Sequence, residues 1–108
     1  MKLDKDFRLI REKDLNRISP GESITIKKID EPEFILRAAR EISLLYREGV
    51  SQSSVDKFVD ILCILETACE KSGVSWLDVS KQRYSTRYEF GKFGRFIGKI
   101  ESSSRSEG

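Results

Sequence analysis

The 108-residue sequence contains no histidine at all. This absence removes the usual general base, the usual nitrogen ligand of zinc and every nucleophile system in which histidine activates serine or cysteine. Any catalysis would have to rest on carboxylates with a hard metal ion, or on lysine, arginine and tyrosine side chains. The sequence therefore excludes most hydrolase chemistries but leaves metal-assisted phosphate chemistry open.

Cysteine is scarce and long apolar runs are missing. The two cysteines, Cys63 and Cys69, are six residues apart on one predicted helix, which places them on different faces, so we interpret them as small core side chains. No apolar run approaches the roughly twenty residues that a membrane span needs, and no signal peptide is recognisable. We expect a soluble, cytoplasmic protein without membrane contact.

Charge of one sign is also lacking, because 20 basic residues face 18 acidic ones and leave a formal net charge of +2. This value is too close to neutral to indicate nucleic acid binding by itself. The distribution is less even: positions 81 to 99 hold six cations and only one carboxylate, Glu89, whereas residues 31 to 80 are net acidic. The chain is short enough for a single domain, and a small core of this kind favours oligomerisation.

The longest apolar segment spans residues 53–71. Its apolar residues follow helical spacing, and several others widen the stripe until little of the surface is polar. Ser53 with Asp56 three residues later is typical of a helix N-cap, and Gly73 is typical of a left-handed stop. The pattern predicts a central helix that must be covered on several sides.

A second amphipathic helix is predicted from Asp30 to Gly49. Asp30 can cap it, Pro32 lies in its first turn, and apolar residues then recur at helical spacing. The connection to the central helix is short, so the two helices should form an antiparallel hairpin. A third helix should start at Ser75 and fade near Arg87.

The remaining segments predict a small sheet and a tail. Residues 23–28 and 93–100 alternate apolar and polar side chains, so we expect them to pair as two strands. Residues 101–108 are serine-rich and polar, which predicts a disordered tail after a single domain of residues 1–100. The expected fold is mainly α, with a helical hairpin, a third helix and a two-stranded β element, assembled into a dimeric helical bundle.

In the order of its predicted elements, the chain resembles the MazG-like all-α nucleoside-triphosphate pyrophosphohydrolases, in particular the small branch related to phosphoribosyl-ATP pyrophosphohydrolase. Residues 8–13, Arg-Leu-Ile-Arg-Glu-Lys, are similar to the Lys-Leu-Val-Arg-Asp-Lys opening of that branch. Residues 24–33 resemble its short strand and acidic lead into the first long helix. Residues 89–97 are similar to its Arg-Gly-Gly-Phe-x-x-Arg stretch. The resemblance implies Mg²⁺-dependent hydrolysis between the α and β phosphates of a nucleotide.

The family's metal motifs are degenerate in this sequence. The resemblance maps the family's Glu-Glu-x-x-Glu motif to residues 40–44, where only Glu41 is acidic, and its Glu-x-x-Asp motif to residues 57–60, where Asp60 remains and the other acid is Lys57. It therefore implies catalytic roles for Glu41 and Asp60. Asp56, one helical turn before Asp60, completes a candidate metal set of Glu41, Asp56 and Asp60. The other interpretation is that Lys57 neutralises Asp60 or Glu41 and that no cofactor is bound.

The resemblance also implies phosphate contacts for Arg87, Lys92 and Arg95, since the corresponding region of the family lies near the substrate. The competing interpretation is that the aromatic residues of this stretch complete the core and that its cations are solvated. We expect a nucleotide-binding MazG-like protein with a degenerate pyrophosphohydrolase site, acting as a homo-oligomer. The alternatives are a pseudoenzyme that binds a protein partner and, ranked below it, a small nucleic-acid-binding module.

Overall fold

The computed structural model describes residues 7–19, 21 and 24–101. These residues fall into two compact units, one ending at Trp76 and the other starting at Leu77. The first unit contains the 3-10 helix η1 (Glu12–Arg17) and the helices α1 (Glu31–Gln52) and α2 (Val55–Lys71). The helix α3 (Trp76–Phe90) starts at the boundary and belongs to the second unit.

The sequence signals at Asp30 place the start of α1. The Asp30 carboxylate accepts a hydrogen bond of 2.9 Å from the backbone N–H of Glu33, and a proline stands in the first turn. The helix continues three residues beyond Gly49 to Gln52. Ser53 then adopts a left-handed conformation with φ of 51°, and its N–H bonds back to the last turn. The predicted N-cap of the next helix, Ser53, is therefore the stop of α1.

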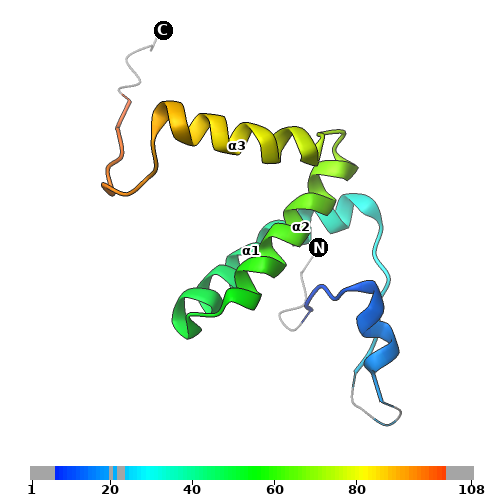
Figure 1. Cartoon of the computed structure of the whole chain (residues 1–108). Helices are drawn as coiled ribbons and strands as arrows, with labels where there is room; N and C mark the ends of the chain where they lie inside the picture. Colours follow the sequence, from blue (N-terminus) through cyan, green and yellow to red (C-terminus); the bar gives the residue numbers. More distant parts are fainter. Residues whose placement is uncertain (1–6, 20, 22–23, 102–108) are drawn as a thin grey trace, which may run out of the picture. The chain divides into compact units, whose positions relative to one another are not determined.

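Ser54 takes over the capping of α2, because its hydroxyl accepts a hydrogen bond of 3.3 Å from the N–H of Lys57. The helix ends at Lys71, and Gly73 follows with φ of 79°, as the sequence predicts. The two-residue connection folds α2 back along α1, so the expected helical hairpin is present (Figure 1).

The hairpin packs through small and aromatic side chains. Ala38 and Leu45 of α1 are buried, and Gly49 is so close to α2 that an added Cβ would lie 2.8 Å from the ring of Phe58. The ring of Phe58 meets Tyr46 edge to face, with 6.4 Å between ring centroids. The contact between the helices is therefore tightest near the turn that joins them.

The expected two-stranded sheet is wrong for the described residues, which contain no strand. Residues 24–28 and 93–100 belong to different units, and their isoleucines are exposed. A strand needs a ladder partner and a buried face to fix its register. The alternation in the sequence has neither. Residue 23 of the first predicted strand and residues 102–108 of the predicted tail lie outside the described part of the chain.

The second unit is built on α3, which has no buried residue. The helix runs past Arg87 to Phe90, where Gly91 stops it with φ of 88° and donates its N–H to the carbonyl of Arg87 at 2.9 Å. None of the helices in the described ranges is long and apolar enough to cross a membrane.

Candidate functional site

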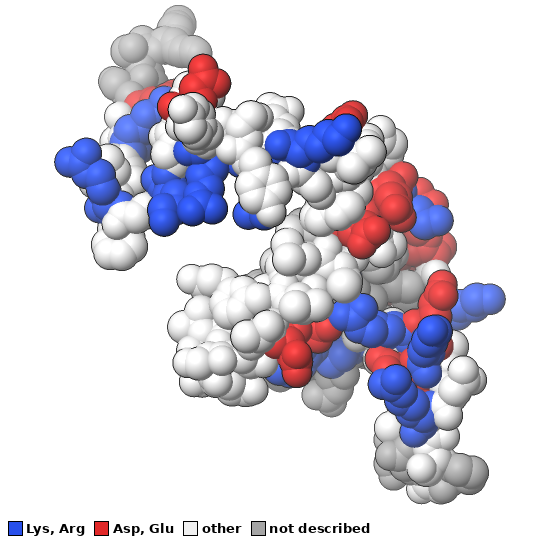
Figure 2. Space-filling view, viewed as in Figure 1, with Lys and Arg blue, Asp and Glu red and all other residues white. Residues whose placement is uncertain are grey.

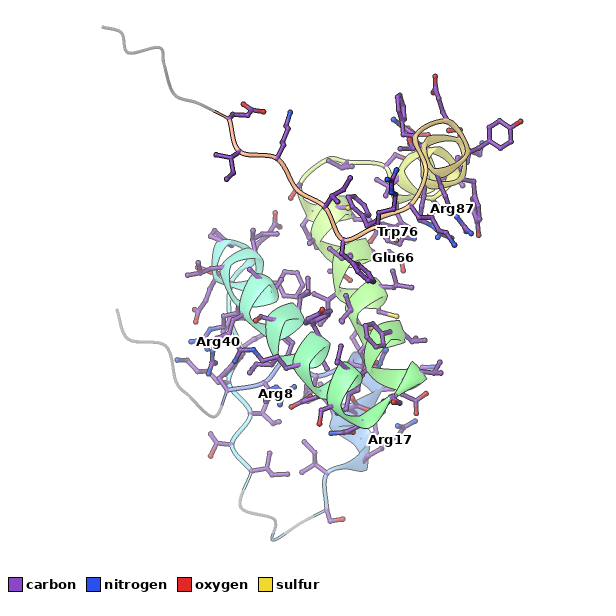
Figure 3. The ribbon with its side chains drawn as sticks, turned by 90° about the vertical axis from the view of Figure 1, so that its left-hand side faces the viewer. Arg8, Arg17, Arg40, Glu66, Trp76 and Arg87 are labelled. Atoms are coloured by element: carbon purple, nitrogen blue, oxygen red, sulfur yellow. The ribbon has the colours of Figure 1, made fainter. Side chains whose placement is uncertain are left out.

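The candidate site lies in the first unit, where the N-terminal arm, defined as residues 7–17, contacts the helical hairpin. Arg8 lies beside α1 and Arg17 is the last residue of η1 (Figure 3). The arm begins at Phe7, whose ring lies 4.0 Å under the guanidinium of the buried Arg37. Arg37 also pairs with Glu33 at 2.6 Å. This cation–π contact fixes one end of the arm to α1.

Arg8 joins two carboxylates of α1. Its Nε donates to Glu41 Oε2 at 2.8 Å, and its Nη1 and Nη2 donate to the two carboxylate oxygens of Glu48 at 3.2 Å each. Glu41 also accepts the backbone N–H of Leu9 at 3.2 Å, and its side chain is only 6% exposed. The single buried carboxylate of the site is thus fully engaged by the arm.

The ion pairs shift the pKa values of this cluster. The hydrogen bond from Arg8 holds the pKa of Glu48 below its ordinary value, and Lys57 lowers it further. The pKa of Arg8 is raised, chiefly by its hydrogen bond to Glu48. Both shifts favour the charged forms, so the pair remains ionised at neutral pH.

Arg11 makes the matching contact on α2. Its Nη2 donates to Asp60 Oδ1. The pKa of Arg11 is raised by hydrogen bonds to Cys63 and then to Asp60, both of which stabilise the guanidinium. The two carboxylates that the sequence marks as catalytic, Glu41 and Asp60, therefore both receive an arginine from the same short arm.

Lys57 does not pair with either of those carboxylates. Its Nζ lies 3.4 Å from Glu48 Oε1, so it adds a fourth charge to the cluster of Arg8, Glu41 and Glu48 instead. The sequence interpretation named lysine as the neutralising residue. In the structure, arginines of the arm occupy that place at Glu41 and Asp60.

The proposed metal ligands do not form one cluster. Glu41 and Asp60 line the same groove, whereas Asp56 is exposed and does not line it. Within the described part of the chain, no three histidine, cysteine or acidic side chains are placed to hold a metal ion. The oxygens of Glu41 and Asp60 already accept guanidinium hydrogen bonds. As arranged, this donor set does not fit the several oxygen ligands that Mg²⁺ requires.

A groove of about 680 Å³ lies between the arm and the hairpin and is lined by residues of both. Apolar side chains line part of it, including Leu9, Phe34, Leu45 and Ile64. Its cations come from the arm: Arg11, Lys13 and Arg17. Its carboxylates outnumber them: Glu12, Asp14, Glu41, Asp60, Glu66 and Glu70. The groove is large enough for a small molecule and carries an excess of negative charge.

The residues expected to contact phosphate lie in the second unit. Arg87 and Lys92 line a separate cavity of about 510 Å³, and Arg95 does not line it. The two predicted parts of the site, carboxylates and phosphate-binding cations, therefore come from different units of the chain.

Sequence reasoning gave no role to Arg8, Arg11 or Glu48. Two signals were present in the sequence. Arg8 and Arg11 belong to the stretch that carries the family resemblance, and Glu48 follows Glu41 by seven residues, or two helical turns on one face. In comparisons with known proteins, this chain matches no family model, no curated protein and no solved structure.

Proposed function

We propose that this chain is a MazG-like protein that binds a nucleotide in the groove between arm and hairpin but does not hydrolyse it. The observation that carries the proposal is the pair of arginines, Arg8 and Arg11, on the carboxylates Glu41 and Asp60. In the family that the sequence resembles, carboxylates on two antiparallel helices hold Mg²⁺. Here guanidinium groups supply the positive charge at those carboxylates.

An arginine can balance a carboxylate, but it cannot activate a water molecule as a metal ion does. Arg8 is also held by Glu48, so its release would break several hydrogen bonds together. A metal ion would have to displace both arginines and still find further oxygen ligands. The chemical step of hydrolysis therefore has no support from these residues, whereas binding remains available to the groove.

The groove composition indicates which nucleotide charge it accepts. Apolar side chains such as Phe34 and Ile64 offer a surface for a base, and Lys13 and Arg17 can contact phosphate. The excess of carboxylates repels additional phosphate groups. We infer that nucleoside monophosphates bind more tightly than triphosphates when no divalent cation is present.

Calorimetric titration of the full chain with nucleoside mono- and triphosphates tests this proposal. We expect heat of binding with a monophosphate, weaker binding of the triphosphate without Mg²⁺, and no pyrophosphate release with Mg²⁺ or Mn²⁺. Lys13→Glu should weaken binding, whereas Lys28→Glu, which makes the same charge change outside the groove, should not. Absence of heat of binding with every nucleotide would refute nucleotide binding, and release of pyrophosphate would refute the non-hydrolysing role.

A second candidate, an interaction protein, is favoured by the apolar surface of the hairpin. Several large side chains of α1 and α2 are more than half exposed: Leu36, Tyr46, Val50, Val55 and Leu62. Such a concentration of apolar surface on two packed helices is typical of an interface. We propose a second copy of the chain as the partner, because a 17-residue central helix without a buried residue lacks cover within its own unit.

Sedimentation equilibrium tests self-association. The chain should be dimeric or larger, and Leu62→Lys should shift it to monomer because a charge cannot be buried without a partner. Gln52→Lys, an equally exposed helical position without an apolar side chain, should leave the assembly unchanged. A monomeric parent chain at high concentration rules out this partner. We further propose a cytoplasmic location, which suits the two free cysteines.

A further inference from the structure

The second unit is basic and also exposes several aromatic side chains. From Leu77 to Glu101 it holds six lysine and arginine residues against three acidic ones. Its aromatic side chains are also exposed: Tyr84 at 63%, Tyr88 at 94%, Phe90 at 77%, Phe93 at 95% and Phe96 at 94%. The cations are grouped over the end of α3 and the residues that follow it (Figure 2).

The cations of this unit are available to a ligand. Lys99 pairs with Glu101 at 2.8 Å, but Arg83, Arg87 and Lys92 have no ion-pair partner among the described residues. Arg83 instead lies over the ring of Tyr84, with 4.3 Å from its guanidinium carbon to the ring centroid. A guanidinium stacked in this way still has its N–H groups free to donate to phosphate.

The turn at Gly91 gathers these residues around one cavity. Arg83 and Arg87 are one helical turn apart on α3, so both project from the same face. Gly91 ends the helix with φ of 88°, and Arg87, Lys92 and Phe93 line the same cavity of about 510 Å³ together with Arg83. Gln82 and Thr86 add polar groups to the lining, which contains no carboxylate.

The cations and aromatic side chains of the second unit together indicate which class of ligand it binds. Lysine is depleted from the core of protein interfaces, and the cavity that holds Lys92 beside two arginines contains no carboxylate to neutralise them, so the ligand itself has to bring the anions. A ligand that meets both features must offer closely spaced anions and flat apolar faces. Single-stranded nucleic acid offers both, as phosphates and unpaired bases.

We propose that the second unit binds single-stranded nucleic acid, with Arg83, Arg87 and Lys92 contacting phosphates and Phe93 stacking on a base. This site is separate from the groove of the first unit and does not depend on nucleotide binding there. The unpaired bases of RNA and DNA share the chemistry that the surface recognises. The duplex form hides those faces and binds through charge alone.

Fluorescence anisotropy of the full chain with labelled single-stranded RNA, single-stranded DNA and duplex DNA tests the proposal. Affinity for both single strands should exceed that for the duplex. The logarithm of the association constant should fall linearly with the logarithm of salt concentration, with a slope of about −2 for three phosphate contacts. Comparable slopes and affinities for RNA and DNA would indicate backbone and stacking contacts, as proposed.

Variants separate charge from stacking. Arg87→Gln and Lys92→Gln should each reduce the salt slope by about 0.7, whereas Phe93→Ala should weaken binding by about 5- to 150-fold and leave the slope unchanged. Phe93 is 95% exposed, so its removal should not disturb folding. Lys27→Gln and Lys28→Gln remove exposed charge from the first unit and should have little effect.

Three results would overturn the proposal. The first is absence of binding to any single strand at low salt, and the second is equal loss of affinity in the Lys27 and Lys28 controls. The third is a Phe93→Ala chain that loses self-association in sedimentation while binding nucleic acid as before, which would assign the aromatic surface to a second copy.

Discussion

The side chain of Arg8 contacts two carboxylates that stand two helical turns apart on α1. Glu41 is buried and also accepts the N–H of Leu9, whereas Glu48 is partly exposed and is shared with Lys57. An ionised carboxylate that is buried without a partner is costly. The strength of this contact therefore depends on Glu41 more than on Glu48.

Arg8→Ala should lower the free energy of unfolding by about 1–3 kcal/mol, because it leaves Glu41 buried with only a backbone donor. Arg17→Ala is the matched control, since Arg17 is 77% exposed and pairs only with its neighbour Asp14. Its loss should cost less than about 1 kcal/mol. Urea denaturation of both variants measures the difference, and equal losses would contradict the special role of Glu41.

The lowered pKa of Glu48 predicts that the stability of the protein depends on pH. Its pKa is lowered from the ordinary value of 4.5 by Arg8, so its contribution to stability is complete above that value and is lost as the pH falls through the lower, folded-state pKa. Glu48→Gln should therefore be less stable than the parent at neutral pH, and the difference in stability should narrow as the pH falls below 4.5.

Urea denaturation across that pH range checks the expectation. Glu70→Gln provides a comparison at a carboxylate of the same groove that has no ion-pair partner among the described residues. A gap for Glu48→Gln that stays constant across the range would mean that Arg8 does not stabilise the ionised carboxylate.

At this scale the family resemblance names Glu41 and Asp60 as candidate site carboxylates, which stays a prediction, and nothing in the sequence predicts which side chains pair with them. Arg8 and Arg11 come from the short stretch that carries the family resemblance, and their partners are 33 and 49 residues away. Contacts of that separation depend on the tertiary fold and cannot be deduced from local patterns.

Among the elements, the hairpin shows how one glycine sets the distance between two helices. Gly49 lies within α1, where alanine would ordinarily be the better helix former by about 0.5–1 kcal/mol. A Cβ at this position would meet the Phe58 ring at 2.8 and 3.1 Å and Lys57 Cβ at 3.2 Å. Packing against α2 therefore opposes the helix propensity.

Gly49→Ala should reduce the free energy of unfolding by about 1–3 kcal/mol, because the helices must separate or Phe58 must leave its preferred position. Gly94→Ala is the control, as an added Cβ there meets nothing within 4 Å and its φ is not positive. Thermal unfolding of both variants gives the comparison. A stabilised Gly49→Ala would show that the hairpin adapts without cost.

The boundaries of α1 and α2 show how far local signals extend. Asp30, Lys71 and Gly73 mark ends that capping rules predict directly, and the structure confirms them. At the turn, α1 ends three residues later than predicted, and the N-cap of α2 lies one residue later. Ser53 and Ser54 are both good caps, and which of them starts α2 depends on how the hairpin closes. The sequence of the turn alone does not distinguish the two.

At the scale of the whole molecule, the two units differ in how much of their backbone is protected by packing. α1 and α2 lie against each other, whereas every described residue of α3 is at least partly exposed. An isolated helix of 15 residues is marginal in water. The second unit should therefore open far more often than the first.

Hydrogen exchange read by mass spectrometry should show α3 amides exchanging much faster than those of α2. Peptides from α1 provide the internal control, because that helix shares the packing of α2. Equal protection of α3 and α2 would contradict the expectation and indicate that another chain covers α3. Addition of single-stranded nucleic acid should slow exchange in α3 alone.

The global arrangement was the least predictable level. Both alternating segments had strand-like patterns, yet they lie in different units and remain unpaired. Strand pairing across about seventy residues requires the intervening helices to bring the two segments together. Local alternation contains no information on whether they do so.

The arm also has a consequence for synthesis of the chain. Arg11 leaves the ribosome 49 residues before Asp60. At about 5–20 residues per second, it waits about 2–10 s for its partner. Arg8 finds its partner Glu41 on α1, which is made first, whereas the contact of Arg11 with Asp60 can form only after α2 has emerged. Until then, Arg11 meets the ions and nucleotides of the surrounding solution without its carboxylate.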